Sequence, residues 1–223
     1  MVTKKKVEAD NSVINVNEAI ELLKKACEEK KRKFVENVDL AINLTIDPKQ
    51  TTQNIRGSVS LPAGTGKQVK VIVLTEDDSL VKEAKDAGAS DAGWTTLVEK
   101  IEGGWLDFDY IVATPDSMKK MGKLAKILGP RGLMPNPKNG NITTEVGKVV
   151  KEIAKGKVNF KNDKFGIIHV GIGKVDFKSE DLLTNINAVI AALKEIKPEG
   201  VKGKYIDNVY LTSTMGPSFL ISL

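Results

Sequence analysis

The apolar positions in the first part of the chain follow two different periods. Ile20 and Leu23 belong to a helical repeat within Asn17–Arg32, which predicts an amphipathic helix. Across Val38–Ile46, apolar residues alternate with polar or small ones, and this alternation is typical of a strand buried on one face. Gln53–Leu61 is expected to form a second strand.

The middle of the chain changes to short, continuous apolar runs that alternate with helical segments. Val69–Leu74 and Tyr110–Ala113 are apolar runs of the kind found in strands covered on both faces. Helices are expected over 78–87, Asp116–Leu128 and Thr143–Lys155. Strands and helices in alternation predict a small α/β domain with a parallel sheet.

The last part of the chain returns to strands and one long helix. Leu182, Ile186 and Val189 recur at helical spacing, which predicts a helix over Ser179–Lys194. A hairpin is expected across Asn162–Lys164. The strands expected here are Val158–Phe160, Ile167–Gly171, Tyr205–Thr214 and Phe219–Leu223.

Neither outer part of the chain has enough elements to close a core of its own, because small units bury too little surface. Together they would form a two-layer α+β domain with two helices on an antiparallel sheet. We therefore predict a discontinuous domain, residues 1–66 and 157–223, into which residues 67–156 are inserted as an α/β domain. The expected hinge residues are Gly66, Lys67, Gly156 and Lys157.

Composition excludes several kinds of site. A net charge of +5 favours an anionic partner, but only mildly. Cys27 is the only cysteine, which excludes an intrachain disulfide and a thiolate zinc site and fits a reducing cytosol. No apolar run approaches the roughly 18 residues of a membrane helix, so no membrane partner is expected. The start, MVTKKKVEAD, lacks the apolar segment of a secretory signal.

The sequence offers little for catalysis. His169 is the only histidine, and without a second histidine or a nearby cysteine it predicts neither a metal site nor a nucleophilic triad. The glycines at 64–67 and 171–174 lack the composition and the strand–loop–helix order of a phosphate-binding loop. We expect no cofactor and no enzyme activity. The alternative is an enzyme that binds a nucleotide through the α/β domain.

Three basic or polar clusters fall within the predicted discontinuous domain. They are Lys33 and Phe34 within KRKFVENV, then Lys157, Lys161 and Lys164, and finally Thr212–Pro217. Lysines supply charge for phosphates, and hydroxyls and backbone amides can contact phosphate and ribose. Each cluster could also be an ordinary solvated helix end, charged hairpin or polar strand end. Their occurrence in one domain favours a composite RNA-binding surface.

Leu128–Gly140, LGPRGLMPNPKNG, is the most unusual segment of the chain. Its three prolines and three glycines exclude a helix or a central strand and predict a shaped surface loop. Such loops often carry function, but a stiff turn between two elements explains the composition equally well.

Four segments carry a resemblance to a known family. They are KFVENVDLAINL (33–44), MGKLAKILGPRGLMPNPKNG (121–140), NDKFGIIHVGIGK (162–174) and TSTMGPS (212–218). In these segments the chain resembles the large-subunit ribosomal stalk protein family, the first in the numbered large-subunit series. The resemblance implies a split RNA-binding α+β domain and an inserted Rossmann-like, three-layer α/β domain, joined by a hinge.

The same resemblance implies a function. The protein would be a structural constituent of the large ribosomal subunit, binding large-subunit ribosomal RNA at the mobile stalk of the exit site. There it would assist the release of deacylated tRNA. Bacterial members also bind their own operon mRNA and repress its translation. The protein would act as a monomer within the ribosome, in the cytoplasm.

The resemblance also implies which residues contact RNA. They are Lys33, Phe34, Glu36, Lys164, Gly166, His169, Thr212, Ser213, Thr214, Met215 and Gly216. Ser213 stands where many relatives carry threonine, so the hydroxyl is retained. The loop Leu128–Gly140 is expected to shape the inserted domain rather than to hold the main RNA site.

Overall fold

The computed structural model describes residues 13–30, 32–198, 201 and 203–222. The predictions made for the first ten residues and for Leu223 therefore lie outside the described residues. The chain divides into two compact units, of which unit 1 comprises the chain up to Gly66 and from Val158 onward, and unit 2 comprises Lys67–Lys157. Both units contain helices and β-sheets, and the predicted α/β and α+β fold class is confirmed.

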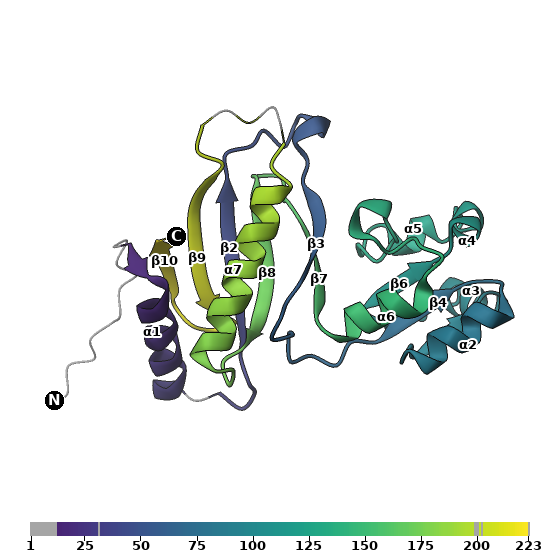
Figure 1. Cartoon of the computed structure of the whole chain (residues 1–223), viewed down its shortest axis with the longest axis horizontal. Helices are drawn as coiled ribbons and strands as arrows, with labels where there is room; N and C mark the ends of the chain where they lie inside the picture. The colour runs from purple at the N-terminus through teal and green to yellow at the C-terminus, as the bar shows by residue number, and fades with distance from the viewer. Residues whose placement is uncertain (1–12, 31, 199–200, 202, 223) are drawn as a thin grey trace. The chain divides into compact units, whose positions relative to one another are not determined.

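Unit 1 is built on a five-stranded sheet in the order β1-β10-β9-β2-β8. The strands are β1 (Ile14–Asn15), β2 (Asn37–Leu44), β8 (Ile167–Lys174), β9 (Ile206–Ser213) and β10 (Ser218–Ser222). Only the pair β1 and β10 is parallel among these neighbours. Strand β2 comes from the first part of the chain and lies between β9 and β8, two strands from the last part (Figure 1).

Two helices, α1 (Val16–Glu29) and α7 (Ser179–Glu195), cover one face of this sheet. Val38, Leu40 and Ile42 alternate toward that face and are fully buried in a single hydrophobic core shared by both parts of the chain. The two helices also contact each other, because the Lys24 ammonium of α1 donates to Ser179 Oγ of α7 at 3.2 Å and to the Phe177 carbonyl oxygen just before α7. The other face of the sheet carries the half-exposed residues between these positions.

The predicted hairpin across Asn162–Lys164 is wrong. Strand β7 (Lys157–Lys161) pairs with β3 (Arg56–Ser60) in a separate two-stranded sheet, whereas β8 pairs with β2. Only an isolated bridge joins Asn162 to Ile168. The Asn162 side chain explains the choice of partner, because its Oδ1 accepts a hydrogen bond from the Ile55 amide at 2.8 Å and ties the end of β7 to the β3 side. A 3₁₀ turn (Thr51–Gln53) precedes β3.

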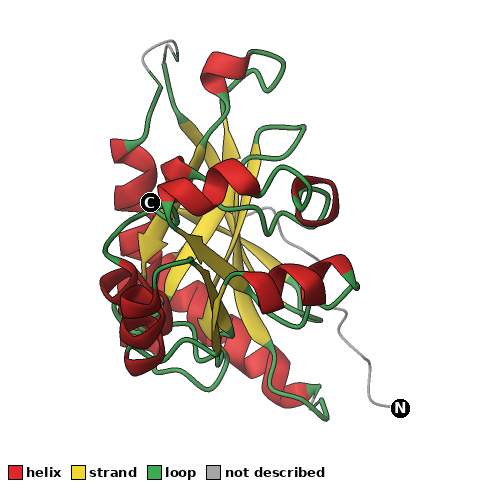
Figure 2. Cartoon of the chain, turned by 90° about the vertical axis from the view of Figure 1, so that its right-hand side faces the viewer, coloured by secondary structure: helices red, strands yellow, loops and turns green. Residues whose placement is uncertain are grey.

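Unit 2 contains a three-stranded parallel sheet in the order β5-β4-β6. Its elements are β4 (Val71–Leu74), α2 (Asp78–Asp86), β5 (Asp91–Gly93), α3 (Thr95–Glu102), β6 (Tyr110–Ala113), α4 (Pro115–Lys120), α5 (Ala125–Leu128), a 3₁₀ turn (Pro137–Asn139) and α6 (Val146–Ala154). One hydrophobic cluster joins the sheet to α3 and α5, and a second joins its other face to α2 and α6. Figure 2 shows the helices flanking the strands, and the arrangement is three-layered and Rossmann-like.

The prediction of one helix over Asp116–Leu128 is wrong. The segment forms two short helices, α4 and α5, separated by a turn that contains Gly122. The apolar face survives the break, because Met121, Leu124 and Leu128 are all buried. Strand β5 and helix α3 were not predicted, because they are too short and too polar at their exposed positions to give a clear period.

Glycines occupy both connections between the units. Gly66 has φ 67° and Gly156 has φ 113°, both in the left-handed region that favours glycine. Lys157 is the first residue of β7 and forms an ion pair with Glu152 at 3.1 Å. Hinge motion at Gly66, Lys67, Gly156 and Lys157 stays a prediction.

Candidate nucleic-acid interface

Two of the predicted contact segments meet at one end of the sheet of unit 1. Strand β2 begins where β9 ends, and Val38 pairs with Ser213. Beyond this pair, the Asn37 amide donates to Thr214 Oγ1 at 3.0 Å, and the Thr214 amide donates to the Asn37 carbonyl oxygen at 3.1 Å. Residues 33–36 and 212–216, far apart in the sequence, are therefore held side by side by backbone and side-chain hydrogen bonds.

The carboxylate of Glu36 lies at the centre of this junction. Glu36 is only 5% exposed, and its Oε2 accepts hydrogen bonds from Ser213 Oγ at 2.8 Å and from the Met215 amide at 3.0 Å. Arg32 Nε lies 3.8 Å from the other carboxylate oxygen. The structure therefore places Glu36 and Ser213 inside the junction, where they shape the turn, although the resemblance had grouped them with the contact residues.

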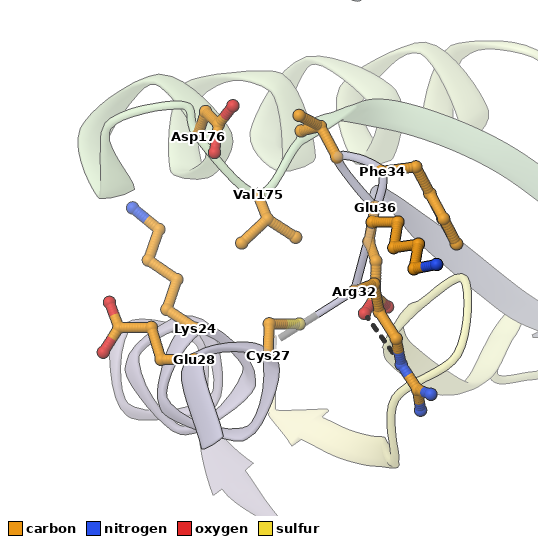
Figure 3. Close-up of a pocket in the computed structure, with 10 residues that line it drawn as sticks. Lys24, Cys27, Glu28, Arg32, Phe34, Glu36, Val175 and Asp176 are labelled. Carbon is orange, nitrogen blue, oxygen red and sulfur yellow. Dashed lines mark ion pairs between the residues drawn. The ribbon is translucent and has the colours of Figure 1, made fainter. Parts of the chain in front are cut away.

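The exposed residues around this junction are apolar as well as cationic. Phe34 is 54% and Met215 is 58% exposed, which is unusual for large apolar side chains. Two grooves flank Glu36, with volumes of about 570 Å³ on the Phe34 side and about 240 Å³ on the Met215 side. Figure 3 shows the first groove, with Cys27 and Val175 at its base and Phe34 at its rim. The arrangement offers apolar contact and cationic charge together.

The third predicted segment lies elsewhere on unit 1. The Leu44 amide donates to the Gly166 carbonyl oxygen at 3.1 Å, so Gly166 lies beside the far end of β2. Asn43 lies six residue steps along the strand from Asn37, which corresponds to roughly 20 Å. Lys164 and Gly166 are therefore not part of the cluster around Glu36, although Lys164 is exposed.

His169 lies on β8, between the two ends of the sheet. It pairs with Ala41 of β2. Two residues away on β2, Asp39 pairs with Gly171 of β8 and with Thr212 of β9. Because residues two apart on a strand share a face, His169 and Thr212 lie on the open face opposite the helices. Ser213, which pairs with the buried Val38 and contacts Cys27 of α1, faces the helices instead, so the predicted residues do not all share one face.

Two carboxylates on this part of unit 1 have shifted pKa values of opposite sign. Desolvation by burial raises the pKa of Asp39, and the neighbouring His169 partly offsets this effect. For Asp163, desolvation also acts to raise the pKa, but hydrogen bonds from the Ile167 and Phe165 amides outweigh it and hold the pKa below its usual range. Asp163 therefore fixes the turn that presents Lys164.

Some residues of the junction were not predicted from the sequence. Arg32 and Cys27 line both grooves, and Cys27 Sγ lies 3.3 Å from Ser213 Oγ. The spacing of four residues between Arg32 and Glu36 was a signal that could have suggested their ion pair. Nothing in the sequence linked Cys27 to Ser213.

Unit 2 does not favour the alternative of a nucleotide-binding enzyme. In an open α/β sheet a nucleotide would bind beyond the carboxyl ends of β4 and β6. The segments after those ends carry four carboxylates and no glycine-rich phosphate-binding loop, and Lys120 and Lys119 there are already paired with Glu76 and Asp116. Within residues 13–30, 32–198, 201 and 203–222, no group of three His, Cys, Asp or Glu residues could hold a metal ion. No helix in the described part of the chain could span a membrane.

Fold and site together define an α/β protein of two compact units, with a polar sheet face and a rim of cationic and apolar residues. The chain belongs to the ribosomal protein L1p/L10e family, whose model matches residues 6–217. The resemblance seen in the four sequence segments is thereby confirmed.

Curated relatives agree over nearly the whole chain. Large ribosomal subunit protein uL1 of Protochlamydia amoebophila is 48% identical over 208 residues, which cover 93% of this chain and 86% of that protein. The proteins of the same name from Thermus thermophilus and Persephonella marina are 47% and 48% identical, and the matches cover 91% and 86% of those proteins. These relatives are ribosomal proteins, and the chain is not an enzyme.

Proposed function

We propose that the protein is a structural constituent of the large ribosomal subunit and binds large-subunit ribosomal RNA through unit 1. Family membership supports the ribosomal role, and the relatives are named as proteins of the large subunit. The observation that carries the proposed RNA site is the junction around Glu36, which holds the segments of the exposed residues Phe34 and Met215 side by side.

The proposed mechanism is recognition without chemistry. Phe34 and Met215 supply apolar contact with bases or riboses, and the backbone near Gly216 allows RNA to approach closely. Thr212 and Thr214 offer hydroxyls near the same surface. Lys33 and Lys164 displace counterions from phosphates. His169, on the open face between them, adds a polar contact that can both donate and accept hydrogen bonds.

The finer role that we propose follows the resemblance. The protein would act as a monomer at the mobile stalk of the exit site in the cytoplasmic ribosome, where it would help deacylated tRNA to leave. It would also bind its own operon mRNA and repress translation. Because the surface around Glu36 is shared by both RNAs in this proposal, excess stalk RNA should displace the mRNA leader.

Replacing Met215 with alanine tests the RNA surface directly. We expect Met215→Ala to weaken binding to a stalk fragment of large-subunit RNA about tenfold, because the lost apolar contact corresponds to ~1.4 kcal/mol. Affinity measured between 50 and 200 mM salt should also fall by roughly 0.7–0.9 log units per log unit of salt for each neutralised phosphate.

The matched control is Val13→Ala, which shortens another exposed apolar side chain of unit 1, next to the edge strand β1. It should leave the affinity unchanged. Equal affinity of Met215→Ala and the unmodified protein, with both folded by circular dichroism, would sink the proposed surface.

A further inference from the structure

Arg32 occupies a position between the two grooves that the sequence motifs did not mark. It follows the C-terminal end of α1 and lines both the groove on the Phe34 side and the groove on the Met215 side. In Figure 3 its guanidinium lies across the groove from Lys24 and Glu28, next to Glu36. An RNA chain that runs from Phe34 to Met215 would therefore cross Arg32.

At this position the negative charge of Glu36 is buried, whereas the positive charge of Arg32 is partly exposed to solvent. The carboxylate of Glu36 is 5% exposed and already accepts hydrogen bonds from Ser213 and the Met215 amide, whereas the Arg32 side chain is 37% exposed. A partner arriving from solvent therefore meets the guanidinium and not the carboxylate. Only Nε takes part in the ion pair, and the two terminal nitrogens of Arg32 have no partner among the described residues.

We propose that Arg32 binds a phosphate group of the RNA at the junction of the two grooves, and that Glu36 holds the guanidinium in position for it. The inference rests on the proposed RNA-binding function and adds a residue to its surface. A guanidinium presents its donors in a planar fork that fits two phosphate oxygens at once. Glu36 attracts the guanidinium from the Nε side at 3.8 Å, which is longer than a hydrogen bond and leaves the fork free for phosphate.

A purely structural role for Arg32 is the competing explanation. Arg32 would then only neutralise the buried charge of Glu36, and its loss would lower stability without changing the electrostatics of RNA binding. The two explanations differ in the salt dependence of the affinity, because each phosphate contact contributes its own increment to the slope.

The experiment measures RNA affinity against salt for the full chain and three variants. Arg32→Gln removes the charge but keeps a donor for Glu36, and it should reduce the slope of log affinity against log salt by about 0.7–0.9. Arg32→Lys keeps the charge and should retain the slope, with an affinity several-fold lower because the fork is lost. The control Lys194→Ala removes an exposed cation near the C-terminal end of α7 that lines neither groove, and it should change neither quantity.

The outcomes separate this inference from the function on which it rests. If Arg32→Gln keeps the full slope and affinity while Met215→Ala still weakens binding, the role of Arg32 is refuted and the proposed surface stands. If neither variant weakens binding, the proposed function fails first. Thermal unfolding of each variant is recorded in parallel, and a lower melting temperature with an unchanged slope would establish the structural role instead.

Discussion

A single buried carboxylate determines the geometry of the candidate interface. Glu36 joins two segments that are separated by about 180 residues of sequence, through hydrogen bonds to Ser213 and to the Met215 amide. Such a group is expensive to bury unless its hydrogen bonds are satisfied. The turn that presents Met215 is therefore coupled to the position of residues 33–36, and small changes near Ser213 should affect both.

Gly216 offers a test of this coupling. A Cβ added at Gly216 would overlap Ser213 Oγ, the same atom that donates to Glu36. We expect Gly216→Ala to displace the Ser213 hydroxyl, to lower the free energy of unfolding by about 1–3 kcal/mol and to weaken RNA binding. Urea unfolding and RNA titration measure the two effects.

Gly122→Ala is the corresponding control, because a Cβ at Gly122 would have nothing within 4 Å. It should be neutral in both measurements. A Gly216→Ala protein as stable as the unmodified chain would show that the turn relaxes without breaking the junction.

The sequence predicted these residues unequally. Phe34 and Met215 could be recognised as surface residues, because they stand in polar segments outside the apolar periods, and both are exposed. The burial of Glu36 could not be predicted, since it depends on a pairing between distant strands. The local sequence around Glu36 would be the same whether its carboxylate faced solvent or accepted a hydrogen bond from the hydroxyl of Ser213.

At the scale of elements, strand β2 carries a carboxylate that opposes folding at neutral pH. The pKa of Asp39 is raised in the folded protein, so the folded state binds the proton more tightly than the unfolded state. Its destabilising effect begins as the pH rises above 3.8 and is complete once the pH exceeds the raised pKa. Asp39→Asn should therefore raise the urea midpoint at pH 7, and the difference should disappear as the pH falls below 3.8.

Asp163 should behave in the opposite way. Its pKa is lowered by the amides of the turn, so its ionised form contributes stability that is present at neutral pH and lost as the pH falls through the lowered value. Asp163→Asn should thus lower the urea midpoint at pH 7 while Asp39→Asn raises it. The same sign for both substitutions would contradict the opposed environments of the two carboxylates.

Local periodicity predicted elements better than it predicted their partners. Tyr110–Ala113 was predicted with its observed bounds, and the strong apolar repeat of α7 was found almost to the residue. The hairpin was wrong because β7 pairs with β3, about a hundred residues earlier in the chain. The helix before the proline-rich loop was wrong because apolar spacing continued through a turn at Gly122 that interrupts the backbone hydrogen bonds.

At the scale of the whole molecule, the hydrophobic cores follow the two units. The core of unit 1 contains Ile20 and Leu40 from the first part of the chain together with Ile186 and Leu211 from the last part. The two clusters of unit 2 draw all their residues from within 67–157. Neither outer part of the chain could bury its apolar residues alone, as expected from their size.

This division makes the insertion of unit 2 experimentally testable. A protein in which a short glycine linker joins Gly66 to Val158 retains the complete core of unit 1 and every residue of the proposed RNA surface. We expect it to unfold cooperatively in urea and to bind the stalk RNA with nearly the affinity and salt slope of the full chain. The complementary fragment 67–157 should fold but bind this RNA only weakly. A joined protein that folds but does not bind would move the RNA site to unit 2, whereas one that does not fold would refute the insertion.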